Sequence, residues 1–223
     1  MNNKVIIITG ATGALGAQVA HTFAARGHSL VLLDHNQGKL DVLTGALGLS
    51  ADRLFASVVD LKNADAVRST AEAVAAKFGM VHGLIHLVGG WVGGKTLPEA
   101  SADELEFMLG QHVWTTFHLF QSFTPLLVKS QWGRVIVVSA STVPSPSRRT
   151  GTYTAAKAAQ ENLVLTQAAE LKEQGVTANI IQVHSIDVGN TGKGTTPEEI
   201  AAAMLYLFSD EASKVSGARI PVY

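Results

Sequence analysis

The sequence has no cysteine, no charge imbalance and no long apolar run, and each absence excludes a class of protein. Without cysteine among its 223 residues, the chain has no disulfide framework, no thiolate metal site and no cysteine nucleophile, and we assign no metal ligands. The 17 basic and 18 acidic residues leave a formal net charge of -1. This balance argues against a nucleic-acid or membrane-surface role that rests on bulk charge. No apolar stretch approaches the roughly 18 residues of a membrane span.

The N-terminus begins MNNKVIIITG, which loosely resembles a signal peptide. Its apolar run covers only Val5 to Ile8 before Thr and Gly interrupt it, so a short buried strand explains it better. No Pro/Ser-rich linker divides the chain, and 47% of its residues are hydrophobic. We therefore expect residues 1–223 to form one domain of a soluble, cytoplasmic protein.

Short apolar runs rich in β-branched residues alternate with longer, alanine-rich amphipathic segments. Runs that are continuously apolar are typical of strands buried on both faces, as in a parallel sheet with right-handed crossovers. The sequence predicts a doubly wound α/β domain with about seven strands and helices on both faces. The expected strands are 4–9, 29–34, 53–59, 83–88, 134–139, 177–183 and 218–222, and the expected helices are 14–26, 38–47, 63–78, 102–130, 151–174 and 197–209. Ser101 with Glu104 and Thr196-Pro197-Glu198 are helix-start signals.

A glycine-rich segment, TGATGALG, lies between the first expected strand and the first expected helix. Glycines there allow a tight turn and a close approach of the backbone to a pyrophosphate, and the helix N-terminus supplies N–H donors. The alternative is a glycine-rich turn without a ligand. The context favours dinucleotide binding in a Rossmann-type domain. The residues expected to form this cradle are Gly10, Thr12, Gly13, Ala14, Leu15 and Gly16.

Two acidic residues follow the next strands. Asp34 ends the second strand, where a carboxylate accepts hydrogen bonds from an adenosine ribose and repels a 2′-phosphate. No arginine adjoins it, so NAD(H) is preferred and NADP(H) remains an alternative; Asp34 can also be an ordinary turn residue. Asp60, followed by Leu61, would lie beside an adenine ring, or else would cap the helix that starts near Asn63.

Tyr153 and Lys157 lie four residues apart in GTYTAAKAAQ, so they share one face of a helix. With the glycine turn and the two acidic residues, this pair makes the chain resemble the short-chain dehydrogenase/reductase family over essentially its whole length. The glycine spacing is more like that of the family's extended and atypical branches, because Ala14 replaces the usual middle glycine. The resemblance implies an oxidoreductase in which Tyr153 transfers the substrate proton and Lys157 lowers the pKa of Tyr153 and binds the nicotinamide ribose.

The chain departs from that family at several positions. The usual catalytic serine falls on Ala140, flanked by Ser139 and Ser141; because neighbours in a strand face opposite ways, a shift of one residue is needed to bring Ser141 into place. His112 replaces an asparagine and is either a proton relay or a buried structural histidine. After the sixth strand, Val183-His184 replaces Pro-Gly. There the resemblance places Ile186 against the cofactor and His184 beside the substrate.

The fourth strand leads into LVGGWVGG, which resembles a segment of the dihydropteridine reductases. Gly89 and Gly90 would approach the cofactor. Trp91 would stack on a flat substrate, or else anchor the loop by hydrophobic contact. A quinonoid or imine acceptor is electron-poor, so it depends less on a second hydrogen-bond donor.

The sequence predicts an NAD(H)-dependent oxidoreductase that acts on a small carbonyl, imine or quinonoid molecule. Its candidate catalytic residues are Tyr153, Lys157, Ser141 and His112. The alternatives are a weakly active or inactive dinucleotide-binding sensor or scaffold, and an isomerase or dehydratase that uses transient oxidation. Family resemblance suggests a homodimer or homotetramer built from helices 102–130 and 151–174.

Overall fold

A computed structural model describes residues 3–223, which form a seven-stranded sheet whose strand pairs are all parallel. The strand order is β3-β2-β1-β4-β5-β6-β7. The strands are β1 (Val5–Thr9), β2 (Ser29–Asp34), β3 (Leu54–Val58), β4 (Gly83–His86), β5 (Gly133–Ala140), β6 (Val176–Val183) and β7 (Arg219–Pro221). The doubly wound α/β fold predicted from the sequence is confirmed.

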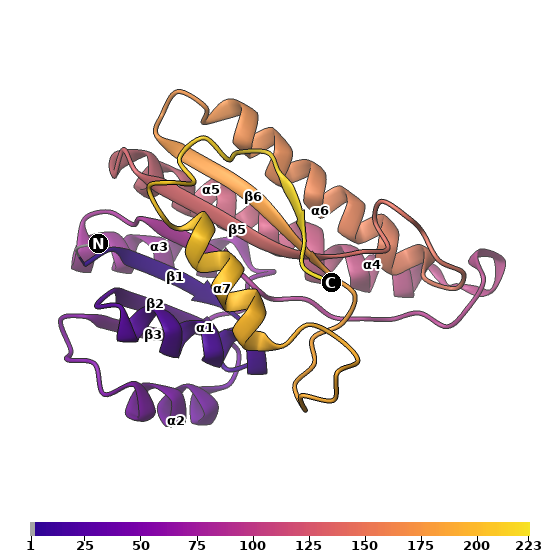
Figure 1. Cartoon of the computed structure of the whole chain (residues 1–223), viewed down its shortest axis with the longest axis horizontal. Coiled ribbons are helices and arrows are strands. Elements are labelled where there is room, and N and C mark those ends of the chain that lie inside the picture. Colours follow the sequence, from indigo (N-terminus) through magenta and orange to yellow (C-terminus); the bar gives the residue numbers. More distant parts are fainter. Residues whose placement is uncertain (1–2) are drawn as a thin grey trace.

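Helices cover both faces of this sheet (Figure 1). One face carries α3 (Ala64–Phe78), α5 (Thr115–Lys129) and α6 (Gly151–Glu170), and the other carries α1 (Ala14–Ala25), α2 (Gln37–Leu47) and α7 (Pro197–Leu207). The short helix α4 (Ala102–Leu109) leads into α5, and a 3₁₀ turn, η1 (Leu97–Glu99), precedes α4. Two separate hydrophobic layers result, one on each side of the strands.

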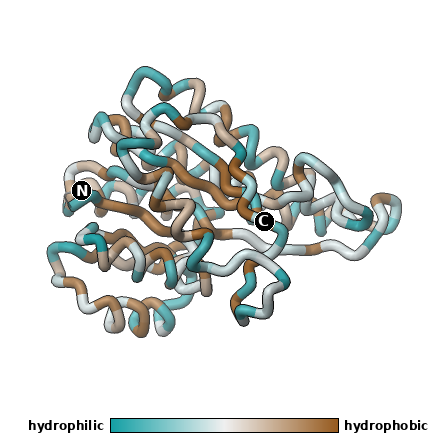
Figure 2. The backbone as a smooth tube through the Cα atoms, viewed as in Figure 1, coloured by the Kyte–Doolittle hydropathy of each residue, from teal (hydrophilic) through white to brown (hydrophobic). Residues whose placement is uncertain are grey.

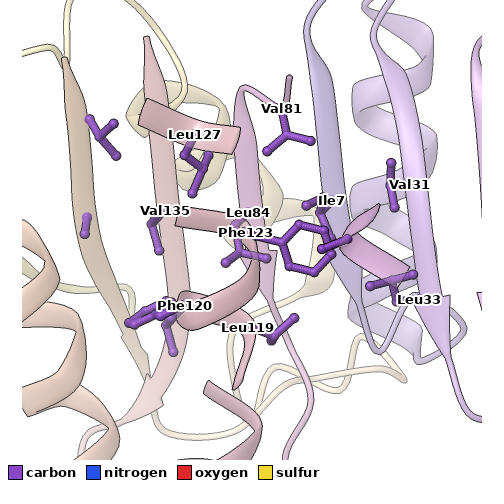
Figure 3. Packing of buried hydrophobic residues seen from close by; sticks show 14 of the residues in the cluster. Ile7, Val31, Leu33, Val81, Leu84, Leu119, Phe120, Phe123, Leu127 and Val135 are labelled. Atoms are coloured by element: carbon purple, nitrogen blue, oxygen red, sulfur yellow. The ribbon is translucent and has the colours of Figure 1, made fainter. Parts of the chain in front are cut away.

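The buried strands alternate their side chains between these two layers. All five residues of β1 are buried, with Ile7 in the layer under α5 and Ile6 and Ile8 in the layer under α1 and α7. Apolar residues therefore follow the strands through the middle of the molecule (Figure 2). In the α5 layer, the ring of Phe123 packs over Ile7 and Leu84 (Figure 3).

The order of the strands reverses between β1 and β4, which are neighbours in space although two strands separate them in sequence. Thr9 and His86 end these two strands and are partners in the pairing register. At such a switch point the connections diverge from the carboxyl ends of the strands and leave a crevice for a ligand. The loops after β1, β2, β3, β4, β5 and β6 are therefore the ones that build the site.

Most predicted helix boundaries agree with the structure within a few residues, with three differences. The expected helix 102–130 is α4 and α5 joined by a π-helical turn, η2 (Gly110–Trp114). The expected helix 151–174 ends at Glu170. The expected helix 197–209 ends at Leu207, while the helix-start signals at Thr196-Pro197-Glu198 and at Ser101 with Glu104 are as predicted. Within residues 3–223, no helix has the combined length and apolarity needed to cross a membrane.

Candidate functional site

The glycine turn after β1 is shaped by contacts that a larger residue would block. A Cβ atom at Gly16 would lie 2.1 Å from the carbonyl oxygen of Gly10, and Gly10 itself has a φ of +65°, which favours glycine. Gly13 precedes α1 in an extended conformation and offers no side-chain cap. The first N–H groups of α1 are therefore open to an anion, which fits a phosphate cradle.

Asp34 lies at the end of β2 beside this turn and is almost fully buried. Its carboxylate accepts hydrogen bonds from the backbone N–H of Thr12 at 2.9 Å and of His35 at 2.8 Å. Burial alone would raise the pKa of Asp34, but the hydrogen bonds from Thr12 and His35 outweigh it and hold the pKa below its usual value. Asp34 is thus a fixed negative charge.

Asp60 does not cap α3. The side chain of Asn63 is the cap, because it accepts a hydrogen bond from the N–H of Ala66, while Asp60 accepts one from Lys62. Asp60 therefore remains exposed and lines the same cavity as Asp34 and Leu61, beside the ends of β2 and β3.

Two cavities meet at Gly10. The inner cavity, of about 430 Å³, lies between the glycine turn and α6, and the outer cavity, of about 450 Å³, lies beyond β2 and β3. Of the residues predicted from the sequence, the inner cavity is lined by Gly10, Gly13, Ala14, Leu15, Gly16, Gly89, Gly90, His112, Tyr153, Lys157, His184 and Ile186. The outer cavity is lined by Gly10, Asp34, Asp60 and Leu61. Thr12, Trp91 and Ser141 line neither.

Lys157 is buried one helical turn after Tyr153, and both line the inner cavity. Its Nζ donates to the carbonyl of Val138 at 2.8 Å and to Oε1 of Gln160 at 2.9 Å. Burial lowers the pKa of Lys157 to about 7, against the nearby charge of Glu161, which raises it. Burial also raises the pKa of Tyr153, so its phenol is protonated at neutral pH.

Sequence reasoning missed the polar side chains behind Lys157. Gln160 is fully buried; its amide donates to Thr116 at 2.8 Å, and the Thr116 hydroxyl donates to the carbonyl of His112 at 2.6 Å. Two polar residues inside an otherwise alanine-rich helix, Gln160 and Glu161, were the available signal. The Glu161 carboxylate is also buried, and it accepts from Gln182 and from Arg219 at 2.5 Å.

His112 lies in the π-helical turn η2, a feature often found at functional sites. Its Nε2 donates to the carbonyl of Gly90 at 2.9 Å, and its ring lies edge-on to Tyr153, with centroids 5.6 Å apart. A Cβ at Gly89 would lie 2.8 Å from this ring, which explains the glycine there. Burial lowers the pKa of His112 to about 3, so the ring is neutral. Its Nδ1 is a buried acceptor without a partner among residues 3–223.

The serines on either side of Ala140 have different surroundings. Ser139 and Ala140 line the inner cavity, and Ser139 shares its sheet face with Val137 and thus with the α6 layer. The Ser139 hydroxyl is buried and has no partner in the described part of the chain. Ser141 instead forms a hydrogen bond with Nδ1 of His184. Of the two serines, Ser139 is thus the one that lines the inner cavity, although its hydroxyl is buried.

His184 lines the inner cavity, whereas Trp91 does not. The ring of His184 stacks on Tyr223, with centroids 4.3 Å apart, and lines the cavity. The side chain of Trp91 is 62% exposed and folds over Gly93. Trp91 therefore lies outside the inner cavity, with most of its ring open to solvent.

A family model described as short chain dehydrogenase matches residues 4–199, which include the glycine turn, Tyr153 and Lys157. The chain belongs to the short-chain dehydrogenase/reductase family. This membership makes it an oxidoreductase-type protein of a family that uses nicotinamide cofactors.

Among curated proteins, the chain is 30% identical over 240 residues to meso-2,3-butanediol dehydrogenase of Serratia marcescens, covering 99% of this chain and 93% of that protein. Two solved structures with less than 25% identity show the same fold. An NAD⁺-bound xylitol dehydrogenase matches with a TM-score of 0.89 and 20% identity, covering 99% of this chain and 98% of the other. An NADPH-bound short-chain oxidoreductase of Pseudomonas aeruginosa PAO1, described as containing an atypical catalytic center, matches with a TM-score of 0.91 and 23% identity, covering 98% and 95%.

Lys157 makes the stability of the protein depend on pH. Its pKa is about 7 when folded and near 10.5 when exposed, so between these values the unfolded chain holds a proton that the folded chain lacks. The free energy of unfolding should therefore rise with pH, by at most about 1.4 kcal/mol per pH unit. Urea unfolding between about pH 7.5 and about pH 9 measures this slope.

Lys157→Met should remove that rise, whereas Lys129→Met, at an exposed helix position, should retain it. An unchanged slope in Lys157→Met would show that the ammonium is not neutralised by folding.

Proposed function

We propose that this chain is an NAD(H)-dependent oxidoreductase that transfers hydride between the nicotinamide and a carbonyl, imine or quinonoid carbon of a small molecule. The observation that carries the proposal is that Tyr153 and Lys157 line the same cavity as the glycine turn. In this proposal residues 1–223 form one NAD(P)-binding domain, and the protein acts in the cytoplasm without nucleic acid or membrane.

The residues present fit a dinucleotide. The inner and outer cavities share Gly10, so an elongated ligand can cross the glycine turn with one end in each. The N–H groups at the start of α1 would hold the phosphates, Asp34 the adenosine ribose, Asp60 and Leu61 the adenine end, and Gly89, Gly90 and Ile186 the nicotinamide end. The cofactor supplies the hydride chemistry that no side chain of the chain can provide.

Tyr153 would act as the acid in the reducing direction. Burial raises the pKa of Tyr153, so the phenol holds its proton until a substrate atom gains negative charge. Lys157 would position the phenol and supply positive charge beside it, and Gln160 would hold Lys157 in place. Neutral His112 would support this arrangement through its edge-on ring and its bond to Gly90.

The substrate class follows from what the inner cavity lacks. Ala140 has no hydroxyl where the family serine lies, and Ser141 is engaged by His184. The buried Ser139 hydroxyl is the remaining candidate for a second donor. An electron-poor imine or quinonoid acceptor needs such a donor least, so a dihydropteridine-reductase-like reaction is the sharpest option. His184, at the mouth, would contact the substrate, with Trp91 reaching it only if its loop moves.

The alternative of an inactive sensor finds no support in the relatives, which carry the names of dehydrogenases and oxidoreductases. Binding of a cofactor alone would not require the Tyr153 phenol and the Lys157 ammonium together. We therefore relate the unusual surroundings of Tyr153 to the choice of the molecule that is reduced.

A homodimer or homotetramer would cover an exposed apolar face on α4, η2 and α5. Phe107, Trp114 and Phe117 are 48%, 53% and 38% exposed there, and the rings of Trp114 and Phe117 lie 6.0 Å apart. Light scattering should give a mass of two or four chains, and Trp114→Ser should lower it; a wild-type monomer would contradict the proposed assembly.

Tyr153→Phe should reduce turnover of the best substrate by about 10²–10⁴-fold, because it removes the proton donor and keeps the ring. The assay follows NADH oxidation with ketones, cyclic imines and quinonoid dihydropterin, and NAD⁺ reduction with meso-2,3-butanediol. Tyr206→Phe, at an exposed position on α7, is the matched control and should keep full activity. Turnover within a few-fold of wild type in Tyr153→Phe would overturn the acid role.

Fluorescence titration should show NADH binding more tightly than NADPH, because ionised Asp34 repels a 2′-phosphate. Asp34→Asn should narrow this preference by about tenfold, since it removes the charge and keeps one oxygen acceptor. Asp41→Asn, on the exposed side of α2, should leave it unchanged. A wild-type preference for NADPH would contradict the role given to Asp34.

A further inference from the structure

A further cavity lies at the edge of the sheet opposite to the inner cavity. It has a volume of about 740 Å³ and opens between the C-terminal end of α6, the first residues of β5 and β6, and segment 210–217. We call it the amino-edge cavity. The polar and aromatic residues that line it include Trp132, Arg134, Lys172, Thr177, Asp210 and Lys214.

Arg134 is the buried charge of this cavity, with only 2% of its surface exposed. Among the described residues, the guanidinium donates hydrogen bonds only through Nη1, to the carbonyl of Gly133 at 2.9 Å and to that of Gly175 at 3.5 Å. Its Nε is buried without a partner, and none of the ion pairs among residues 3–223 includes it. Burial lowers the pKa of Arg134, and the nearby charge of Asp210 offsets this only in part. A buried guanidinium with no direct ion pair is costly to fold, so an anion bound beside it would stabilise it.

Two neighbours hold the guanidinium in place without neutralising it. The face of Trp132 lies 4.0 Å from the guanidinium carbon, a cation–π contact that fixes its plane. Thr177 pairs with Arg134 in the register of β5 and β6, so both side chains project from the same sheet face. The Thr177 hydroxyl is also buried without a partner in the described chain.

The charges that face this cavity are mostly positive. Lys172 from the end of α6 and Lys214 from segment 210–217 are exposed at its walls. The one carboxylate in the lining belongs to Asp210, and it accepts the indole N–H of Trp132 at 2.6 Å. The lining therefore holds three cations and one carboxylate, and this excess of positive charge suits a dianion such as a phosphate.

We propose that the amino-edge cavity binds a phosphate group, either free phosphate or the phosphate of a small organic molecule, between Arg134, Lys172 and Lys214. The site is separate from the proposed cofactor site, because its residues lie at the amino ends of β5 and β6, whereas the glycine turn lies at the carboxyl end of β1. The volume of the cavity leaves room for an organic group beyond the phosphate.

Trp132 reports binding at this cavity alone. The chain has three tryptophans, so in a Trp91→Phe/Trp114→Phe background the fluorescence comes from Trp132. The probes are inorganic phosphate, glucose 6-phosphate and, as a neutral control, glucose, each titrated at constant ionic strength set with KCl. We expect a saturable change with the two phosphates and none with glucose. Tighter binding of glucose 6-phosphate than of phosphate would identify an organic ligand, and equal binding would identify phosphate itself.

Lys172→Gln/Lys214→Gln should weaken the phosphate affinity by about tenfold, because two charge-assisted contacts are lost. Both lysines are exposed, so the fold should be retained. The matched control is Lys39→Gln/Lys129→Gln, which removes the same charge from exposed positions outside the cavity and should leave the affinity unchanged.

The proposal is overturned if no probe gives a saturable change, or if both double variants weaken binding equally. It is also overturned if phosphate has no effect while Lys172→Gln/Lys214→Gln changes the oligomeric mass, since the cavity would then be an interface between copies of the chain. None of these outcomes depends on catalysis, so they leave the proposed oxidoreductase function untouched.

Discussion

The ammonium of Lys157 is buried between β5 and α6, and a buried cation requires nearby acceptors. The acceptors are the carbonyl of Val138 on the strand and the amide of Gln160 on the helix, with the carboxylate of Glu161 close by. These contacts fix the rotation of α6 relative to the sheet, and so they fix the direction in which Tyr153 points. Gln160 then reaches Thr116 on α5, which ties the second helix and the π-helical turn to the same charge. Hydrogen bonds that start at this ammonium therefore connect one strand, two α-helices and the π-helical turn around the inner cavity.

Burial shifts the pKa values of Tyr153 and Lys157 in opposite directions, and in both residues it favours the neutral form. It raises the pKa of the phenol and lowers the pKa of the ammonium, because both charged forms lose contact with water. In the free protein the phenol is neutral, and the amine is near its midpoint at neutral pH. Two groups so close to a change of charge in a low-dielectric space respond strongly to any charge that enters the inner cavity.

The strands, the glycine turn and the location of Tyr153 and Lys157 could be predicted from the sequence because they depend on local patterns: apolar runs, glycine spacing and helical periodicity. The partners of Lys157 could not. Gln160 and Thr116 are 44 residues apart, and their contact depends on how α5 and α6 pack. The choice between Ser139 and Ser141 depended on where β5 ends, and the cap at Asn63 rather than Asp60 depended on where α3 begins. The cavity beside Arg134 likewise arises from segments 132–134, 172–177 and 210–217, which only the tertiary structure brings together.

The chain of hydrogen bonds from Lys157 through Gln160 and Thr116 ends on the backbone carbonyl of His112. A carbonyl accepts a hydrogen bond but has no proton to pass on, and a side-chain amide does not ionise in water. The hydrogen bonds behind Lys157 thus form a continuous chain of contacts, but this chain does not conduct protons. Each proton that Tyr153 gives away would then be replaced from the side of the inner cavity, where the substrate also binds in the proposed reaction. The substrate and the replacement protons would then reach Tyr153 from the same side. A bound molecule that fills this space would also block the return of a proton to Tyr153.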